Sequence, residues 1–139
     1  MLVFVTAPAV PLPDWLPSML ALFSRDERAG VVGTRVLSPI GSLEEAGGIL
    51  AADGSPRRRG EGDHNPDRPQ YRFVKRVDFC SRPLLATRRE LFERLKGFDG
   101  GIVAPADALV DFSLRAGRAA ASVYYQPHAR IVRIGGADR

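Results

Sequence analysis

The chain has 139 residues, of which 45% are hydrophobic and 26% are charged. This composition is that of an ordinary globular protein, and the length suits one domain with a single core. No apolar run approaches the roughly 18 residues that a membrane span needs, so no membrane span is expected. The apolar start is too short for a secretory signal, and the lone Cys80 excludes an internal disulfide. These features favour a cytoplasmic protein.

The net charge of +4 comes almost entirely from arginine, because Lys75 and Lys96 are the only lysines. Basic residues are scattered among acidic ones and do not alternate with aromatic residues as in RNA-binding modules, so no nucleic-acid partner is expected. The run Arg-Arg-Arg at residues 57–59 could contact a phosphate or an acidic partner. A run of three like charges is, however, more often a solvated surface.

The first elements alternate between strand and helix. A β-branched and aromatic run at residues 2–5 predicts a strand, and the prolines between residues 8 and 13 argue against regular pairing after it. Asp14 is a typical N-cap for a helix whose apolar stripe begins at Trp15 and ends by residue 28. A second strand is predicted over residues 31–37.

Turn-forming residues dominate the next part of the chain. Pro-Ile-Gly at residues 39–41 and Asp-Gly at residues 53–54 predict turns on either side of the apolar segment 46–50. Residues 55–70 are rich in Pro, Gly, Asp, Asn and Arg and almost free of apolar side chains. That composition predicts an exposed loop with some disorder.

Residues 72–99 carry the most informative pattern. Apolar runs at residues 74–79 and 84–85 have the length of strands, and the apolar side chains of residues 91–95 follow at helical spacing. Gly97 is a typical residue for the end of that helix. The stretch therefore predicts a strand, a tight corner, a second strand, a helix and a turn.

The C-terminal part predicts a helix and two strands. The helix covers residues 106–116, and the strands cover residues 122–125 and 129–134, separated at Pro127. Together the elements predict a single α/β domain over residues 1–139, with a mixed sheet and flanking helices.

The central stretch resembles the glycosyltransferases of family 2, which have the GT-A fold. The match has no gap through V-D-F-C-S at residues 77–81, L-L at 84–85, R-R-E-L-F at 88–92 and G-F-D at 97–99. Further similar segments lie at residues 2–16, 30–33, 41–49 and 125–132. The resemblance implies that the chain corresponds to the second, acceptor-side half of the fold. The nucleotide-binding first half would then precede Met1.

The resemblance also implies a chemistry: transfer of a sugar from a nucleoside diphosphate to an acceptor, with Mn²⁺ or Mg²⁺ as cofactor. The metal-binding carboxylate of the family falls on Pro8, which has no side-chain oxygen. The distal histidine of the family falls on Arg133, and Arg82 replaces a small residue beside the donor sugar. We therefore expect no metal site and no cofactor in this chain, and Arg82 and Arg133 are candidate phosphate contacts.

The catalytic base of the family precedes the last core helix. One alignment places Ala108 and Leu109 there, which removes the base, whereas a shifted gap makes Asp107 or Asp111 a candidate. Asp107 equally suits the N-terminus of a helix, where the dipole favours an acid. Asp99, in the Gly-Phe-Asp turn, is a candidate on the acceptor side.

These departures predict a glycosyltransferase-like domain that is degenerate and inactive as an isolated chain. One alternative is the active part of a larger glycosyltransferase of polysaccharide biosynthesis, with a glycan acceptor. Another is a non-catalytic module that binds carbohydrate or protein. A sheet that begins at Met1 would leave an open edge, which predicts homodimerisation or docking to the missing N-terminal half.

Overall fold

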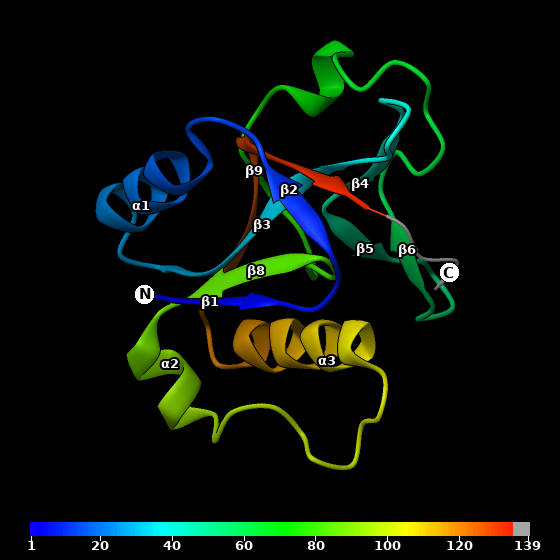
Figure 1. Cartoon of the computed structure of the whole chain (residues 1–139). Coiled ribbons are helices and arrows are strands. Elements are labelled where there is room, and N and C mark those ends of the chain that lie inside the picture. The colour runs from blue at the N-terminus through cyan, green and yellow to red at the C-terminus, as the bar shows by residue number, and fades with distance from the viewer. Residues whose placement is uncertain (135–139) are drawn as a thin grey trace.

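The structure is a computed structural model that describes residues 1–134. A seven-stranded mixed sheet forms its centre, with α1 on one face and α2 and α3 on the other (Figure 1). The helices are α1 (Trp15–Arg25), α2 (Arg89–Arg94) and α3 (Pro105–Arg118), and η1 (Pro69–Tyr71) is a 3-10 turn. The strands are β1 (Leu2–Val5), β2 (Ala9–Pro11), β3 (Ala29–Leu37), β4 (Leu43–Ala46), β5 (Gly48–Leu50), β6 (Pro56–Arg58), β7 (Lys75–Arg76), β8 (Leu84–Thr87) and β9 (Ser122–Arg133). Among the described residues, no helix combines the length and apolar character that crossing a membrane requires.

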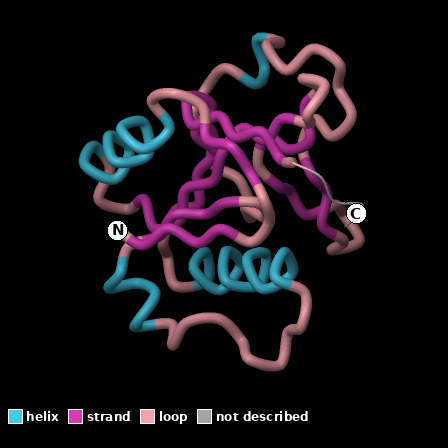
Figure 2. The backbone as a smooth tube through the Cα atoms, in the orientation of Figure 1, coloured by secondary structure: helices cyan, strands magenta, loops and turns pink. Residues whose placement is uncertain are grey.

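The strand order of the large sheet is β1-β8-β3-β9-β2, with β4 added to β3 and β7 added to β9. Figure 2 shows the strands, in magenta, at the centre of the molecule and the helices, in cyan, outside them. Strands β3 and β9 run parallel, whereas the other pairs are antiparallel. Strands β5 and β6 form a separate hairpin. The predicted fold class, a mixed sheet with flanking helices, is confirmed. Strand β1 lies at an edge of the sheet, and a partner at that edge stays a prediction.

Alternate residues of the central strands face opposite helical layers, as the two-residue period of a strand requires. Val32 on β3 packs with Met19 and Leu22 of α1. Its neighbour Val31 packs with Phe112 of α3 on the other side. Beneath the sheet an aromatic cluster, with ring centroids 4.7 to 5.6 Å apart, joins β1, α2, the following turn and α3 through Phe4, Phe92, Phe98 and Phe112.

The proline-containing segment is more regular than the sequence indicates. Ala9–Pro11 forms β2 and pairs with the end of β9, where Pro11 lies opposite Ile131. Because β2 is an edge strand, a residue without an N–H group is tolerated there. Asp14 does occupy the N-cap position of α1, but its φ is 72° and its side chain makes no capping hydrogen bond. Instead its main-chain oxygen accepts a hydrogen bond from Ser18 Oγ.

The two strands expected at the C-terminus are one. Strand β9 continues through Pro127 because its register against β3 shifts at this point: Thr34 pairs with Gln126, whereas the next residue pairs with Arg130. The extra residues form a bulge that accommodates the proline. The strand expected over residues 74–79 is reduced to β7 and an isolated bridge between Gly48 and Phe79.

Residues 55–70, where the sequence predicts an exposed loop, are mostly exposed but contain β6. Asp63 ties the rest of the segment together, because its carboxylate accepts hydrogen bonds from the Asn65 N–H and, at 2.7 Å, from the Tyr71 hydroxyl. The Arg68 guanidinium donates a further bond of 2.8 Å. These donors lower the pKa of Asp63 to about 2. Polar bonds therefore shape a segment that has little apolar surface to bury.

Gly48, the first residue of β5, has no room for a side chain. A Cβ atom on Gly48 would lie 2.1 Å from Cε1 of Phe79, whose side chain is buried. We expect Gly48→Ala to lower the free energy of unfolding by about 1–3 kcal/mol, the usual cost of overpacking a core. Gly117→Ala is the matched control, because a Cβ on this exposed residue of α3 meets nothing within 4 Å. It should stabilise by up to about 1 kcal/mol. Urea unfolding followed by circular dichroism measures both, and an unchanged midpoint for Gly48→Ala would contradict the steric account.

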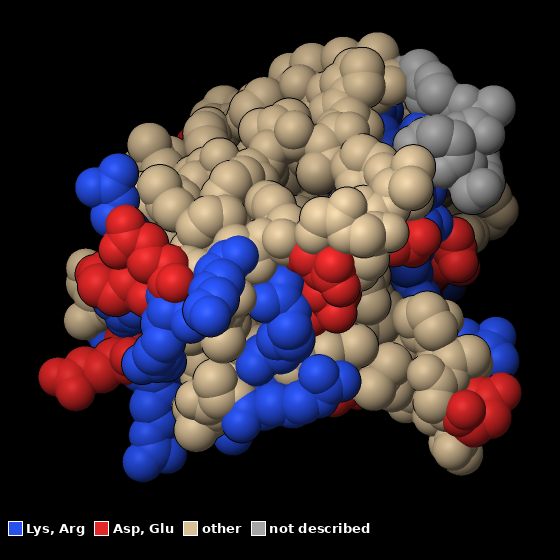
Figure 3. Space-filling model, turned by 90° about the horizontal axis from the view of Figure 1, so that it is seen from below, with Lys and Arg blue, Asp and Glu red and all other residues tan. Residues whose placement is uncertain are grey.

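Basic side chains are not confined to one part of the molecule. On the underside, Lys and Arg gather near the centre with Asp and Glu beside them (Figure 3). The last turns of α2 and α3 carry Arg94, Arg115 and Arg118. A functional role for individual arginines therefore has to be argued from burial and geometry, because net charge does not single them out.

Candidate functional site

Three segments that are distant in sequence meet at one end of the sheet. Residues 6–8 follow β1, and the N–H of Thr6 donates a 2.8 Å hydrogen bond to the carbonyl of Pro83. At the other end of this segment the carbonyl of Pro8 accepts a 2.9 Å bond from the N–H of Ile134, the residue after Arg133. Thus the positions that the resemblance assigns to the metal, the donor sugar and the pyrophosphate lie side by side.

A cavity of about 450 Å³ opens beside these segments. Its charged lining consists of Arg58, Arg82, Arg133, Glu44 and Glu61, and Ile40 from the turn between β3 and β4 lies at its rim. Two of the three arginines are almost fully buried, with 7% of Arg82 and 2% of Arg133 exposed. Buried guanidinium groups that line a cavity are typical of sites that bind phosphate or carboxylate groups.

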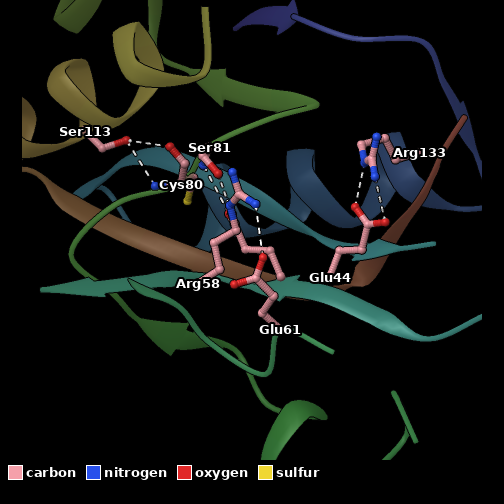
Figure 4. A network of polar contacts seen from close by, with 8 residues as sticks. Glu44, Arg58, Glu61, Cys80, Ser81, Ser113 and Arg133 are labelled. Atoms are coloured by element: carbon pink, nitrogen blue, oxygen red, sulfur yellow. Dashed lines mark hydrogen bonds and ion pairs between the residues drawn. The ribbon is translucent and has the colours of Figure 1, made fainter. Parts of the chain in front are cut away.

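Arg133 is held in place by Glu44 of β4. Its Nε lies 2.6 Å from Glu44 Oε1 and its Nη2 lies 3.0 Å from Glu44 Oε2, a two-pronged ion pair (Figure 4). The guanidinium is therefore oriented before any ligand arrives. The resemblance singled out the position of Arg133 but not its carboxylate partner.

Glu45, the next residue of β4, lies on the opposite side of the strand in a buried network. Its carboxylate accepts hydrogen bonds from the N–H of Ser81, at 3.1 Å, and from the Ser81 hydroxyl. Arg58 Nε lies 3.7 Å from Glu45 Oε1, and Arg58 Nη1 bonds Glu61 Oε2 at 3.2 Å (Figure 4). Burial raises the pKa of Glu45, although the bonds from Ser81 and the nearby Arg58 and Arg82 oppose that shift.

A second cavity, of about 280 Å³, adjoins the first and shares Arg58 and Glu61 with it. Asp107 lines this cavity from the first turn of α3, together with Ser81 and Phe79. The structure therefore brings Asp107 close to the segment that carries Arg82. Leu109, which one alignment places at the base position, is 1% exposed and belongs to the core.

Asp111 and Asp99 lie outside both cavities. The carboxylate of Asp111 accepts a 2.9 Å bond from Nε of Arg115, whose other nitrogens bond the carbonyls of Leu95 and Gly97. Asp111 thereby helps to join α3 to the end of α2. Asp99 is exposed, and its Oδ1 accepts a 2.9 Å bond from the N–H of Gly101. The structure therefore does not bring Asp99 or Asp111 into the lining shared with Arg82 and Arg133, and the roles expected for them stay predictions.

The run at residues 57–59 is not a uniformly solvated surface, and that interpretation is wrong for two of its members. Only Arg57 is exposed. Arg58 lies between the two cavities, and Arg59 donates a 2.9 Å bond to the carbonyl of Ala46 and stacks over Tyr71 and Tyr125. Sequence reasoning considered Arg58 only as part of the run at residues 57–59, and it missed Glu45. The pair of glutamates at residues 44–45, within a largely apolar segment, was a usable signal.

The donor groups at the predicted metal position do not fit a divalent cation. Hard cations require several oxygen ligands, usually from carboxylates. Residues 6–8 are Thr-Ala-Pro, and the Thr6 hydroxyl is directed to the carbonyl of Pro83 at 3.4 Å. Within residues 1–134 no group of three or more His, Cys, Asp or Glu side chains is placed to hold a metal ion. The positively charged side chains that line the first cavity are those of Arg58, Arg82 and Arg133.

Comparisons with known proteins bear on the fold. No protein-family model matches the sequence, and a search of curated proteins finds no match. Among solved structures the chain is similar to the crystal structure of GalNAc-T7 with UDP, GalNAc and Mn2+, with a TM-score of 0.68 at 15% identity. The fold is GT-A-like. The similarity covers 98% of this chain but only 28% of that chain, so it concerns one part of a longer protein. The assignment to family 2 stays a prediction.

Proposed function

We propose that the chain is a glycosyltransferase-like domain that binds the diphosphate of a nucleoside-diphosphate sugar. The binding site is the first cavity, which Arg58, Arg82 and Arg133 line and which we call the arginine cleft. The observation that carries this proposal is the pair of buried arginines, Arg82 and Arg133, that lines a cavity beside Pro8. The GT-A-like fold supports it, because the structure with which the chain aligns contains UDP and GalNAc.

The chemistry of sugar transfer explains why arginines would be needed. Negative charge develops on the diphosphate as the bond to the sugar breaks, and the site must stabilise that charge. Guanidinium groups in a partly enclosed cavity can do so with charge-assisted, two-pronged hydrogen bonds. Glu44 already occupies the fork of Arg133, so a diphosphate would share that guanidinium or displace the carboxylate.

We further propose that the isolated chain transfers sugar weakly or not at all. Asp107 is the best-placed base because it lines the second cavity, but it is exposed and no partner is described that would activate it. General bases in enzymes are usually activated by burial or by neighbouring groups. A glycan is the acceptor class that the proposal implies.

Calorimetric titration of the purified chain tests the proposal. UDP, GDP and inorganic pyrophosphate are each titrated with Mn²⁺ and with a chelator. We expect binding that is the same in both conditions, because the protein supplies the positive charge. Binding that requires Mn²⁺ would mean that Pro8 does not mark the lost metal position. Absence of binding would overturn the proposal that the arginine cleft binds a diphosphate. A transfer assay with radiolabelled UDP-sugars should show no product, and robust transfer would contradict the inactive state.

A further inference from the structure

Glu45 is a buried carboxylate beside the cleft, with 3% of the residue exposed. Strand β4 carries it, and two other segments converge on it. Ser81 begins the turn that carries Arg82 and donates both its N–H and its hydroxyl to the carboxylate. Arg58, from β6, approaches the same carboxylate from the hairpin. Glu45 thus lies behind the cavity that Arg58 and Arg82 line from separate elements.

We propose that Glu45 is a positioning residue, which holds Arg58 and the turn at residues 81–83 at the separation that a diphosphate requires. This inference rests on the proposed function, because the ligand is the diphosphate that the cleft is proposed to bind. Glu45 does not line either cavity and acts through the two arginines.

Positioning and simple charge have opposite consequences for an anionic ligand. If Glu45 contributed only its charge, removing it would make the cavity more positive and binding of an anion tighter. If Glu45 holds the turn, removing its carboxylate leaves the Ser81 N–H and hydroxyl with weaker partners. Arg82 then loses its fixed position, and binding becomes weaker. The direction of the change therefore distinguishes the two roles.

Two glutamate variants make the comparison. Glu45→Gln removes the charge and one acceptor of the buried network, whereas Glu61→Gln removes an equal charge from the other carboxylate that pairs with Arg58. Glu61 is 56% exposed and makes no bond to Ser81, so it is the matched control. With pyrophosphate as the probe, we expect Glu45→Gln to weaken binding about tenfold. Glu61→Gln should instead tighten binding, because it removes a negative charge from the lining of both cavities. Tighter or unchanged binding by Glu45→Gln would overturn the inference.

Ser81→Ala provides a second variant in case Glu45→Gln does not fold. It keeps the buried charge and removes only the hydroxyl donor, so a purely electrostatic role predicts no change. Positioning predicts binding of pyrophosphate that is weaker by about threefold. Thermal unfolding of each variant confirms that the population titrated is folded.

Hydrogen exchange measured by NMR gives a readout that needs no ligand. The Ser81 N–H donates to Glu45, so its exchange should accelerate in Glu45→Gln and stay slow in Glu61→Gln, while amides of β3 and β9 stay protected in both. If the wild-type chain binds no pyrophosphate, the proposed function fails, and this exchange still decides whether Glu45 holds the turn. Unchanged exchange at Ser81 would overturn the positioning role.

Discussion

Phe112→Ala is expected to lower the free energy of unfolding by about 3–5 kcal/mol, the range found for removing a large aromatic side chain from a core. Phe112 is fully buried at the middle of α3. Its ring centroid lies 5.5 Å from that of Phe92 and 5.6 Å from that of Phe98. Both of those rings also contact Phe4 of β1. Removing Phe112 therefore leaves a cavity where α2, α3 and the sheet join.

Chemical unfolding at equilibrium, followed by far-UV circular dichroism, measures this effect. Phe112→Leu keeps much of the apolar volume and should cost less than about 2 kcal/mol. Val103→Ala is the surface control, because Val103 is 96% exposed, and its effect should stay within about 0.5 kcal/mol. Removing an aromatic side chain from a core usually costs about 3–5 kcal/mol. A loss of less than about 1 kcal/mol for Phe112→Ala would therefore mean that the aromatic cluster is not part of the core.

Arg133→Lys is expected to weaken binding of pyrophosphate about tenfold, which corresponds to roughly 1.4 kcal/mol. Lysine keeps the charge but lacks the planar fork that can grip two oxygens at once. It also cannot reproduce the two-pronged pair with Glu44, so the cation is no longer oriented. The change therefore tests geometry at constant net charge.

Arg130→Lys is the matched control for Arg133→Lys. Arg130 lies on the same strand, is exposed and does not line either cavity of the cleft. Calorimetry at fixed ionic strength should show the wild-type dissociation constant for this control. Equal affinities for the wild type and Arg133→Lys would remove Arg133 from the proposed site and leave Arg58 and Arg82 to be tested in the same way.

The sequence predicted best those elements whose signals are local. Strand β8, helix α2 and the turn at Gly97 lie where the apolar spacing placed them, because each follows from a few consecutive residues. Gly97 has a φ of 70°, and Lys96 before it also has a positive φ. Right-handed helices commonly end with a residue in this left-handed backbone conformation. The mixed sheet with flanking helices follows from the same patterns.

Elements that depend on distant partners were predicted less well. Pro11 lies in a strand because β9 offers an edge partner, and β9 passes Pro127 because β3 accepts a bulge. Neither partner is visible in the local sequence. The same holds for the cleft. Glu45 is a candidate because it accepts a hydrogen bond from Ser81, and Arg58 because it pairs with Glu61, and neither contact is evident from the sequence. Pairing across 36 residues, as between Glu45 and Ser81, leaves no periodic signal in a single chain.

Neighbouring carboxylates on β4 make the length of an exposed turn matter. Because successive side chains leave a strand on opposite faces, Glu44 reaches Arg133 while Glu45 reaches Ser81. A shift of β4 by one residue would exchange the faces on which the two glutamates lie. It would thereby break both the Glu44–Arg133 pair and the Glu45–Ser81 hydrogen bonds. The turn at residues 38–42 sets this register, with the Ser38 N–H bonded to the Ser42 carbonyl at 2.8 Å and their hydroxyls 2.7 Å apart. Surface turns commonly tolerate inserted residues. The length of this turn, however, sets the register of β4 and so the positions of Glu44 and Glu45 beside the arginine cleft. Its residues should therefore vary more freely in type than in number.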